Sequence, residues 1–476
     1  MPNQHYAIKL SVQKEPGIIE ILDGQSKICN WLRNHLLDEA AKLKGAFIKQ
    51  QDQKVAKTLY SKRGLRNLLP KIKQEKPFLK VVHSSVLKNV ALSVSESIRR
   101  YQAAKKEKKK VGWPVYRSWK RQWHCLFYDE PDKGFFVEGS LLTISLGMGE
   151  DCKQRSLSLT IKDVHLLKDK KIRNLRIVSE LEEYYAVFTV EKEEKPLKDI
   201  AKVIALDPNH KNFAYGVDLE GKAIEIEAPN WLKSYDRQTD ELKAKRDCCN
   251  KKAHKVAILD KEGKDTGKFY YKPSRRWSKL NSTLNKSYNK RREQTKTFMY
   301  TVANQLIAAY DCVGIGDYVP HGNGVTTKMR RAMNNRSLIG RFKKVLSWVA
   351  KKSGKAVVIY DEKGTTRTCC TCLFQVEEGL HPSIRTWQCP DCKTVHLRDE
   401  NASINGLKKT LACLTENSGI CFPQVSCSDL VVKKRCAWRV LTSGVLKKYR
   451  GGETVGKPSH SDKKFNEESG ISSPAI

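Results

Sequence analysis

Two pairs of cysteines in the second half of the chain have the spacing of metal ligands. Cys369 and Cys372 form the first Cys-x-x-Cys pair. Cys389 and Cys392 form the second pair, with sixteen residues between the two. Each pair aims two sulfurs from one tight turn, so four thiolates can surround one tetrahedral zinc ion. Because four thiolates leave no open coordination position, the pattern predicts structural zinc in a ribbon over residues 367–394.

Three acidic residues stand where strands are expected to end or a helix to begin. Asp207 and Glu362 each follow an apolar run typical of a buried strand, and Asp399 precedes a helix expected over 400–412. If these carboxylates converge, divalent cations must relieve their repulsion, and hard oxygen ligands suit Mg²⁺. Two such ions would activate water and stabilise the leaving oxygen in phosphodiester hydrolysis. Taken singly, each acid is equally typical of a turn or a helix cap, so the hypothesis rests on the set.

The composition points to a polyanionic partner. The 476 residues include 89 Lys and Arg against 52 Asp and Glu, a formal net charge of +37. The basic residues are spread along the whole chain and no apolar run approaches spanning length, which favours nucleic acid over a membrane. The first residues carry neither a basic nor an apolar signal region, so we expect a cytoplasmic protein. In that reducing compartment the fifteen cysteines are expected as free thiols and metal ligands.

The first 200 residues combine strand and helix patterns. Residues 6–12 alternate as a half-buried strand does, whereas 18–44 and 79–101 have helical periodicity. Short apolar runs between 126 and 190 are typical of successive strands with turns between them. We therefore expect a small antiparallel barrel that carries a helical insertion after its first strand.

Basic residues beside aromatic ones suggest contacts to nucleic acid. Aromatic and basic side chains alternate from Tyr116 to His124, an arrangement that offers faces for bases and charges for phosphates. Each tryptophan there is equally typical of a core. The basic residues that we expect to bind nucleic acid are Arg117, Lys120, Arg121, Arg291 and Arg292.

From residue 201 onward, strands alternate with helices. Apolar runs at 203–206, 312–316 and 356–360 indicate buried strands, and the segment 231–307 between the first two is mostly helical and strongly basic. This alternation predicts an α/β layer whose sites form at the carboxyl ends of the strands. Residues 413–449 are poorly informative.

Four ordered motifs resemble the TnpB family. They lie at 205–213, 365–372, 389–392 and 398–405, the last reading Arg-Asp-Glu-Asn-Ala-Ser-Ile-Asn. TnpB proteins are transposon-encoded, RNA-guided DNA endonucleases related to compact type V CRISPR effectors. The resemblance implies an RNase H fold nuclease of the RuvC type, interrupted by a zinc ribbon and preceded by a wedge-type barrel with recognition helices.

The resemblance also implies partners, catalytic residues and domain limits. The partners are a guide RNA and double-stranded DNA, which is cut beside a short flanking motif; a monomer is favoured and no membrane is involved. Asp207 matches the first catalytic acid and Asp399 the last. The expected domains are the barrel over 1–15 and 111–200, the helical insertion over 16–110, the nuclease over 201–366, the ribbon over 367–394, a closing nuclease segment over 395–412, and an extension over 413–476 that is disordered from about 451.

One position departs from the family pattern. The middle catalytic Glu of the family lies on the second strand, where this chain has Gly316. Asp317 follows at once, but successive strand residues face opposite sides. A branch that includes the eukaryotic Fanzor relatives carries this Glu after the next strand, and Glu362 fits that role. Asp317, Asp361 and an inactive site remain alternatives.

The departure leaves two other functions open. A non-cleaving, RNA-guided DNA-binding repressor would arise if the acids were incomplete. An ordinary transposase would need the same acids but no guide RNA. The sequence favours an active Mg²⁺-dependent nuclease because Asp207 and Asp399 are both present.

Overall fold

A computed structural model describes residues 5–118, 122–149, 151, 153–192, 195–197, 199–209, 212–259, 263–317, 338–381, 384–418 and 430–450. The chain divides into two compact units, one up to Glu193 and one that begins at Glu194. None of the helices within these ranges combines the length and apolar character needed to cross a bilayer.

The first unit contains two antiparallel sheets. One has the order β1-β7-β6-β2 and the other β3-β4-β5. The strands are β1 (His5–Ser11), β2 (Leu126–Tyr128), β3 (Phe135–Glu138), β4 (Leu141–Met148), β5 (Gln154–Thr160), β6 (Ile172–Glu180) and β7 (Glu183–Glu191). A bridge between Val12 and Ile161 connects the segments that follow β1 and β5. Closure of these sheets into a barrel stays a prediction.

Helices occupy the chain between β1 and β2, where the insertion was expected. They are α1 (Pro16–Gln50), α2 (Gln53–Tyr60), α3 (Leu69–Glu75) and α4 (Ser84–Lys106), with 3₁₀ turns at Leu65–Leu68 and Pro77–Val81. A proline at the first position of α1 suits a helix start, since its missing N–H is not needed there. The two long helices were predicted; α2 and α3 were not.

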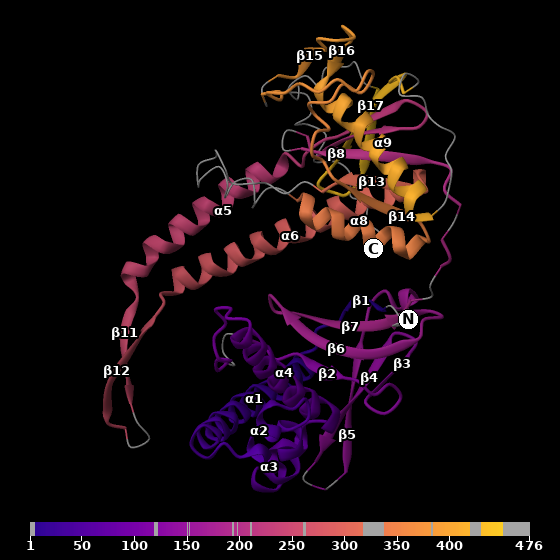
Figure 1. Cartoon of the computed structure of the whole chain (residues 1–476). Helices are drawn as coiled ribbons and strands as arrows, with labels where there is room; N and C mark the ends of the chain where they lie inside the picture. The colour runs from indigo at the N-terminus through magenta and orange to yellow at the C-terminus, as the bar shows by residue number, and fades with distance from the viewer. Residues whose placement is uncertain are drawn as a thin grey trace. The chain divides into compact units, whose positions relative to one another are not determined.

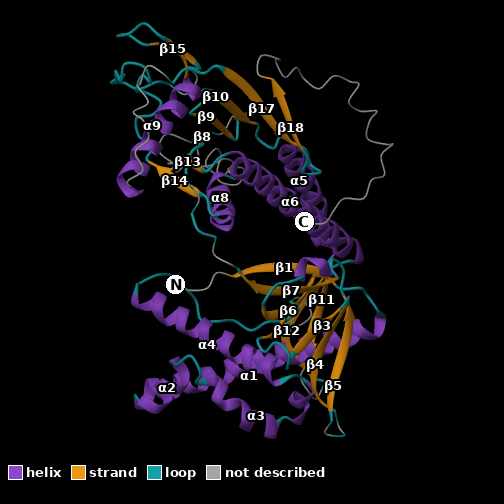
Figure 2. Cartoon of the chain, turned by 90° about the vertical axis from the view of Figure 1, so that its right-hand side faces the viewer, coloured by secondary structure: helices purple, strands orange, loops and turns teal. Residues whose placement is uncertain are grey.

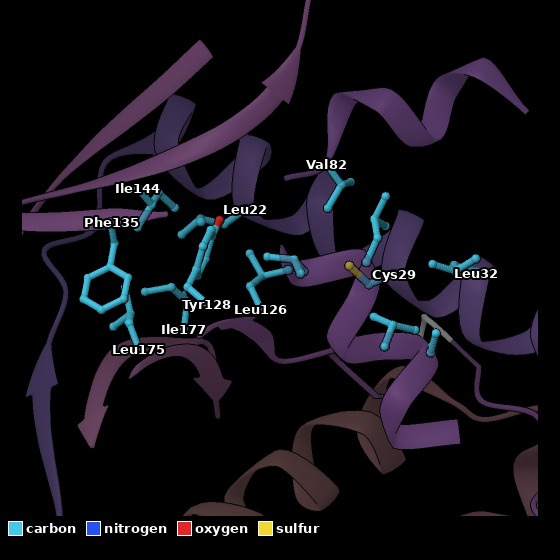
Figure 3. Packing of buried hydrophobic residues seen from close by; sticks show 14 of the residues in the cluster. Leu22, Cys29, Leu32, Val82, Leu126, Tyr128, Phe135, Ile144, Leu175 and Ile177 are labelled. Carbon is cyan, nitrogen blue, oxygen red and sulfur yellow. The ribbon is translucent and has the colours of Figure 1, made fainter. Parts of the chain in front are cut away.

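One core joins the helices to both sheets of this unit. Figure 3 shows Leu22 of α1 beside Tyr128, with Cys29 of α1 on one side of Tyr128 and Phe135 and Ile144 on the other. Leu22, Cys29 and Tyr128 are fully buried. Burying a large apolar side chain contributes roughly 1.5–3 kcal/mol, so this shared core stabilises the insertion and the sheets together.

The second unit is built on a seven-stranded mixed sheet with the order β14-β13-β8-β9-β10-β17-β18. Its strands are β8 (Val203–Pro208), β9 (Ala214–Asp218), β10 (Lys222–Ile226), β13 (Cys312–Gly316), β14 (Ala356–Tyr360), β17 (Lys434–Val440) and β18 (Leu446–Arg450). Strands β8, β13 and β14 are parallel, so their carboxyl ends meet at one edge of the sheet. Residues that were expected to form a C-terminal extension supply β17 and β18, and β17 pairs with β10 in parallel.

Helices cover both faces of this sheet. The apolar face of α6 (Arg275–Ala309) and α8 (Ile339–Ser353) packs on residues such as Leu206 and Ile315. Helix α9 (Arg398–Ser418) packs on the opposite face, where Ala205 and Tyr360 are buried. Figure 2 shows α9 on one side of the strands and α6 and α8 on the other.

Helix α9 lies unusually close to the sheet because glycines face it. A Cβ added to Gly314 of β13 would lie 2.0 Å from Thr410 Oγ1 of α9. A Cβ added to Gly406 of α9 would lie 2.3 Å from the Tyr360 hydroxyl oxygen. Any larger residue at either position would push the helix from the strands.

A long two-helix arm leaves the sheet between β10 and β13. It consists of α5 (Trp231–Cys248) and the first part of α6, joined by a hairpin of β11 (His254–Leu259) and β12 (Asp265–Lys272). The hairpin forms a two-stranded sheet at the far end of the arm (Figure 1). The sequence pattern predicted the helices but not the hairpin, because exposed strands need not alternate apolar and polar residues.

Candidate active site

Asp207 lies at the carboxyl end of β8, on the face that α9 covers. Strand residues alternate between faces. Leu206 belongs to the core beneath α6 and α8, whereas Ala205 belongs to the core beneath α9. Asp207 therefore faces the α9 side, as Ala205 does. Its partner across the sheet is Tyr215 of β9.

Glu362 fills the space beside Gly316. Gly316 ends β13 and pairs with Tyr360 of β14, two residues before Glu362. A Cβ added to Gly316 would lie 2.0 Å from Glu362 Oε1 and 2.3 Å from its Cγ. The carboxylate from the loop after β14 thus occupies the volume that a side chain at position 316 would need.

The neighbouring acids Asp317 and Asp361 are engaged with backbone groups. Asp317 Oδ1 accepts the N–H of Glu362 at 3.1 Å. Asp361 Oδ1 accepts the N–H of Lys363 at 2.9 Å. Both side chains are exposed. Asp317 therefore fixes the loop that carries Glu362, and Asp361 stabilises the turn that follows.

Asp399 lies in the first turn of α9. Its Oδ1 is 3.6 Å from Nη1 of Arg385, so Asp399 forms an ion pair with a residue of the adjacent cysteine-containing module. The position suits a carboxylate, because the N-terminus of a helix carries partial positive charge. Ser403 donates to the Asp399 carbonyl oxygen at 2.8 Å, one turn further along the helix.

Asp207 lies within electrostatic reach of both other acids. Burial raises the pKa of Asp207 well above its usual range, and the negative charges of Glu362 and then Asp399 raise it further. Arg398 acts in the opposite direction on the same pKa. Burial, with the charges of Asp207 and Glu362, also raises the pKa of Tyr360, whose hydroxyl donates to the Leu206 carbonyl oxygen at 2.7 Å.

The carboxylates are spread more widely than the ligands of one ion. Among the described residues, the only set of three or more potential ligands with all atoms within 4.8 Å of one another is the cysteine cluster. Two-metal sites hold ions about 3.5–4 Å apart, so their ligands are spread over a longer distance. A role of the three acids in holding Mg²⁺ stays a prediction.

The four predicted zinc ligands converge. Cys369, Cys372, Cys389 and Cys392 have their sulfurs within 4.8 Å of one another. The sulfurs of Cys369 and Cys392 are 3.6 Å apart, as are those of Cys372 and Cys389. Tetrahedral Zn–S bonds of about 2.3 Å place sulfurs about 3.8 Å apart, so the cluster fits zinc.

A short antiparallel pair supports this cluster. It consists of β15 (Thr386–Gln388) and β16 (Val395–Leu397), which pair Trp387 with His396. His396 Nε2 lies 3.1 Å from Cys369 Sγ, where it can donate to a metal-bound thiolate. The module is thus held by its cysteines and by a small aromatic contact.

Two asparagines attach the cysteine module to α9. Asn401 accepts the Cys370 N–H at 2.8 Å and donates to the Thr368 carbonyl oxygen at 2.8 Å. Asn405, one turn later, donates to the carbonyl oxygens of Thr365 at 2.9 Å and Thr368 at 2.7 Å. The sequence analysis missed this role. The signal was present as two asparagines four positions apart, on one face of a predicted helix.

Glu400 ties the start of α9 to the sheet. Arg435 of β17 holds Glu400 with two bonds of 3.0 Å, and Tyr215 donates to the same carboxylate at 3.2 Å. This network was also missed, because β17 lies in a segment whose sequence gave no clear pattern.

The residues expected to bind nucleic acid have different surroundings. Arg117 is exposed, and its backbone is held by Asn34. Arg291 pairs with Asp236 across the arm at 3.1 Å, whereas Arg292 is more exposed and contacts Asn289 and Glu293. Lys120 and Arg121 lie outside the described residues, as does the expected disordered tail.

Comparisons with known proteins agree with the motifs. Residues 340–406 match the family described as Cas12f1-like, TNB domain. The TnpB-like proteins L79 and L770 of Acanthamoeba polyphaga mimivirus are each 30% identical over 141 residues. The expected resemblance to TnpB is confirmed. The match to these TnpB-like relatives covers 28% of this chain and 26% of theirs, so the chain spans about a quarter of their length.

Solved structures with similar chains include two type V effector complexes. One is the Cas12f1-sgRNA-target DNA complex, with 12% identity, a TM-score of 0.45, and coverage of 85% of this chain and 98% of that chain. Another is CasPhi-2 (Cas12j) bound to crRNA and phosphorothioate-DNA, with 11% identity, a TM-score of 0.38, and coverage of 89% and 93%. Similarity at this level assigns no activity.

Proposed function

We propose that this protein is an RNA-guided DNA endonuclease that cleaves double-stranded DNA beside a short flanking motif, using Mg²⁺. The observation that carries the proposal is the meeting of Asp207, Glu362 and Asp399 from three separate segments. Three acids gathered where strands end are costly to keep ionised without cations, which is typical of a metal-dependent site. The guide RNA and the DNA substrate are inferred from the resemblance to TnpB.

Each acid has a distinct part in the proposed centre. Asp207 is the buried acid whose pKa Glu362 and Asp399 both raise, so it would be the central Mg²⁺ ligand. Glu362 and Asp399 would supply the further carboxylate ligands. Bound Mg²⁺ supplies an activated water and a positive charge at the leaving oxygen. Tyr360 holds the end of β8 through the Leu206 carbonyl oxygen and keeps Asp207 in place.

Glu362 is the third acid we propose, ahead of Asp317 and Asp361. Its carboxylate lies over Gly316, the position at which the family usually carries the residue. It raises the pKa of the buried Asp207 more than Asp399 does. Each of the other two candidates is exposed and accepts a backbone N–H with one of its oxygens, which holds it against the local backbone.

The zinc module is proposed as scaffolding. Four thiolates leave no coordination position for substrate. Asn401 and Asn405 connect the module's first loop to α9, and Arg385, the residue before β15, pairs with Asp399. Zinc would therefore affect cleavage only indirectly, by keeping Asp399 in place.

Nucleic-acid binding is proposed to be mainly electrostatic. A net charge of +37 is suited to a guide RNA and a DNA duplex bound together. Sequence choice would come from base pairing with the guide, while the protein reads the flanking motif and the duplex shape. Affinity should then fall steeply with salt.

One sequence of experiments tests the function and separates it from its alternatives. The full chain is purified, the bound RNA is sequenced, and the complex is incubated with Mg²⁺ and a plasmid library that carries a matching target beside random flanks. Cleavage of the library beside one short motif, lost in Glu362→Ala and Asp207→Ala, is the expected result. Specific RNA and DNA binding with no cut in the wild type would indicate the repressor. Strand joining without bound RNA would indicate a transposase.

A further inference from the structure

The hairpin at the end of the arm exposes three aromatic rings. Phe269, Tyr270 and Tyr271 of β12 are 47%, 51% and 64% exposed. Strands β11 and β12 form a sheet of their own, remote from the seven-stranded sheet (Figure 1). A two-stranded hairpin alone in water is marginally stable, and adjacent exposed rings are typical of an interaction site.

The strand register places rings on both faces of the hairpin. Lys255 pairs with Tyr271, and Ala257 pairs with Phe269, so these four residues share one face. The ring centroids of Phe269 and Tyr271 are 5.6 Å apart with an interplanar angle of 87°. Lys255 Nζ lies 3.9 Å above the Phe269 ring. Tyr270 projects from the other face opposite Val256.

Positive charge surrounds these rings. The segment 249–276 contains nine Lys and Arg residues against three Asp and Glu residues. Near the base of the arm, a cleft of about 900 Å³ between α5 and α6 is lined by Lys233, Arg237, Lys286 and Lys290, among others. The arm therefore offers cations along its length and planar faces at its end. This combination matches the phosphates and bases of a nucleic acid strand.

We propose that the β11–β12 hairpin is a stacking platform for unpaired nucleotides of RNA, with Phe269, Tyr270 and Tyr271 as the stacking residues. The inference rests on the RNA partner of the proposed function and adds a site to it. Bases in a duplex are stacked on one another and hide their faces, whereas loops of folded RNA present unpaired bases to aromatic side chains.

Photo-crosslinking of the purified complex tests where the RNA lies. The full chain with its co-purified RNA is irradiated with ultraviolet light, digested, and searched for peptides that carry a nucleotide. Ribonucleotide adducts on the peptide containing residues 269–271 are expected. Adducts elsewhere with none on this peptide would overturn the platform, as would deoxyribonucleotide adducts there only after target DNA is added. Absence of any co-purified RNA would instead refute the proposed function itself.

A double variant measures the contribution of the rings. Phe269→Ser with Tyr271→Ser should release bound RNA faster under heparin challenge, by roughly five- to a hundredfold for each stacked base lost. Phe136→Ser on β3 is the matched control, since Phe136 is 49% exposed; it should release RNA at the wild-type rate. The melting temperature of the double variant should be unchanged, because the rings are exposed. If the double variant releases RNA at the wild-type rate, the proposal is overturned, whether or not the melting temperature of the variant falls.

Discussion

Replacing Gly316 by alanine should slow cleavage about a hundredfold without unfolding the protein. The added Cβ would lie 2.0 Å, 2.3 Å and 2.5 Å from Oε1, Cγ and Cδ of Glu362, while ordinary carbon contacts are about 3.5–4.0 Å. The Glu362 head group must therefore move by about 1 Å or more. It is the end of a flexible side chain, so the movement costs little stability. A misplacement of about 1 Å at a reacting centre costs roughly a hundredfold in rate.

Removing the carboxylate should cost more than displacing it. Glu362→Ala takes away a whole ligand, and a loss of about 4 kcal/mol of transition-state stabilisation corresponds to roughly a thousandfold in rate. Moving the acid back to the strand should recover part of that loss. In Gly316→Glu combined with Glu362→Gly, the new carboxylate enters the volume that Glu362 now fills.

The assay is single-turnover plasmid cleavage in Mg²⁺ with saturating complex, next to a thermal melt of each variant. Gly340→Ala is the matched control, because a Cβ there meets nothing within 4 Å. Asp317→Asn distinguishes a metal ligand from a residue that only supports the Glu362 loop, because the amide oxygen of Asn can still accept the Glu362 N–H. This variant should cut at close to the wild-type rate. Wild-type cleavage by Glu362→Ala, or abolished cleavage in Asp317→Asn with Glu362→Ala active, would refute the assignment.

Four further outcomes are expected from the same geometry. The folded-state pKa of Asp207 is raised above its unfolded value, so the stability of the metal-free wild type should fall as pH rises from the ordinary Asp range to that raised value. Asp207→Asn should remove this pH dependence. Mg²⁺ should raise the melting temperature of the wild type more than that of the variant. Cys372→Ser should lose zinc, measured by metal analysis, with new protease cleavage inside the module and reduced DNA cutting; zinc-loaded variant protein that resists protease would contradict the cluster. Asn405→Ala removes one of two donors to the Thr365 and Thr368 carbonyl oxygens, because Asn401 still donates to both, and a loss of about 0.5–1.5 kcal/mol should appear in thermal or denaturant melts. Arg292→Gln should weaken nucleic-acid binding evenly across sequences and reduce the salt slope by about one, whereas an unchanged slope would remove Arg292 from the interface.

Much of the second unit could be predicted because its central strands β8 and β13 are buried on both faces. The third strand, β14, was expected to be buried, but it lies at the edge of the sheet and only Tyr360 in it is buried. The runs ending at Asp207, Gly316 and Tyr360 are continuous and apolar, and the observed strands end at or within one residue of those positions. The cysteine cluster was equally predictable, since ligand spacing alone specifies it. The roles of the three acids remain a prediction, but their proximity follows from the parallel strands.

Other features depended on long-range contacts that no local pattern encodes. Strand β17 has no distinctive run of its own, and it joins the sheet because Trp438 enters the core beneath α6 and pairs with Ile226. The β11–β12 hairpin is exposed, so its sequence lacks the alternation that a buried face imposes. The basic sequence of this segment predicted mostly helix, so the hairpin was not predicted.

The close approach of α9 to the sheet links the three acids to the cysteine cluster. Gly406 admits the Tyr360 ring end, and Tyr360 in turn holds the Leu206 carbonyl oxygen beside Asp207. Asn401 and Asn405 on the same helix hold the loop that carries Cys369. A shift of α9 would therefore move Asp399, the support of Asp207 and the cysteine module at once. For that reason, loss of zinc is expected to reduce cleavage through the position of α9, with the folds of β8 and β13 retained.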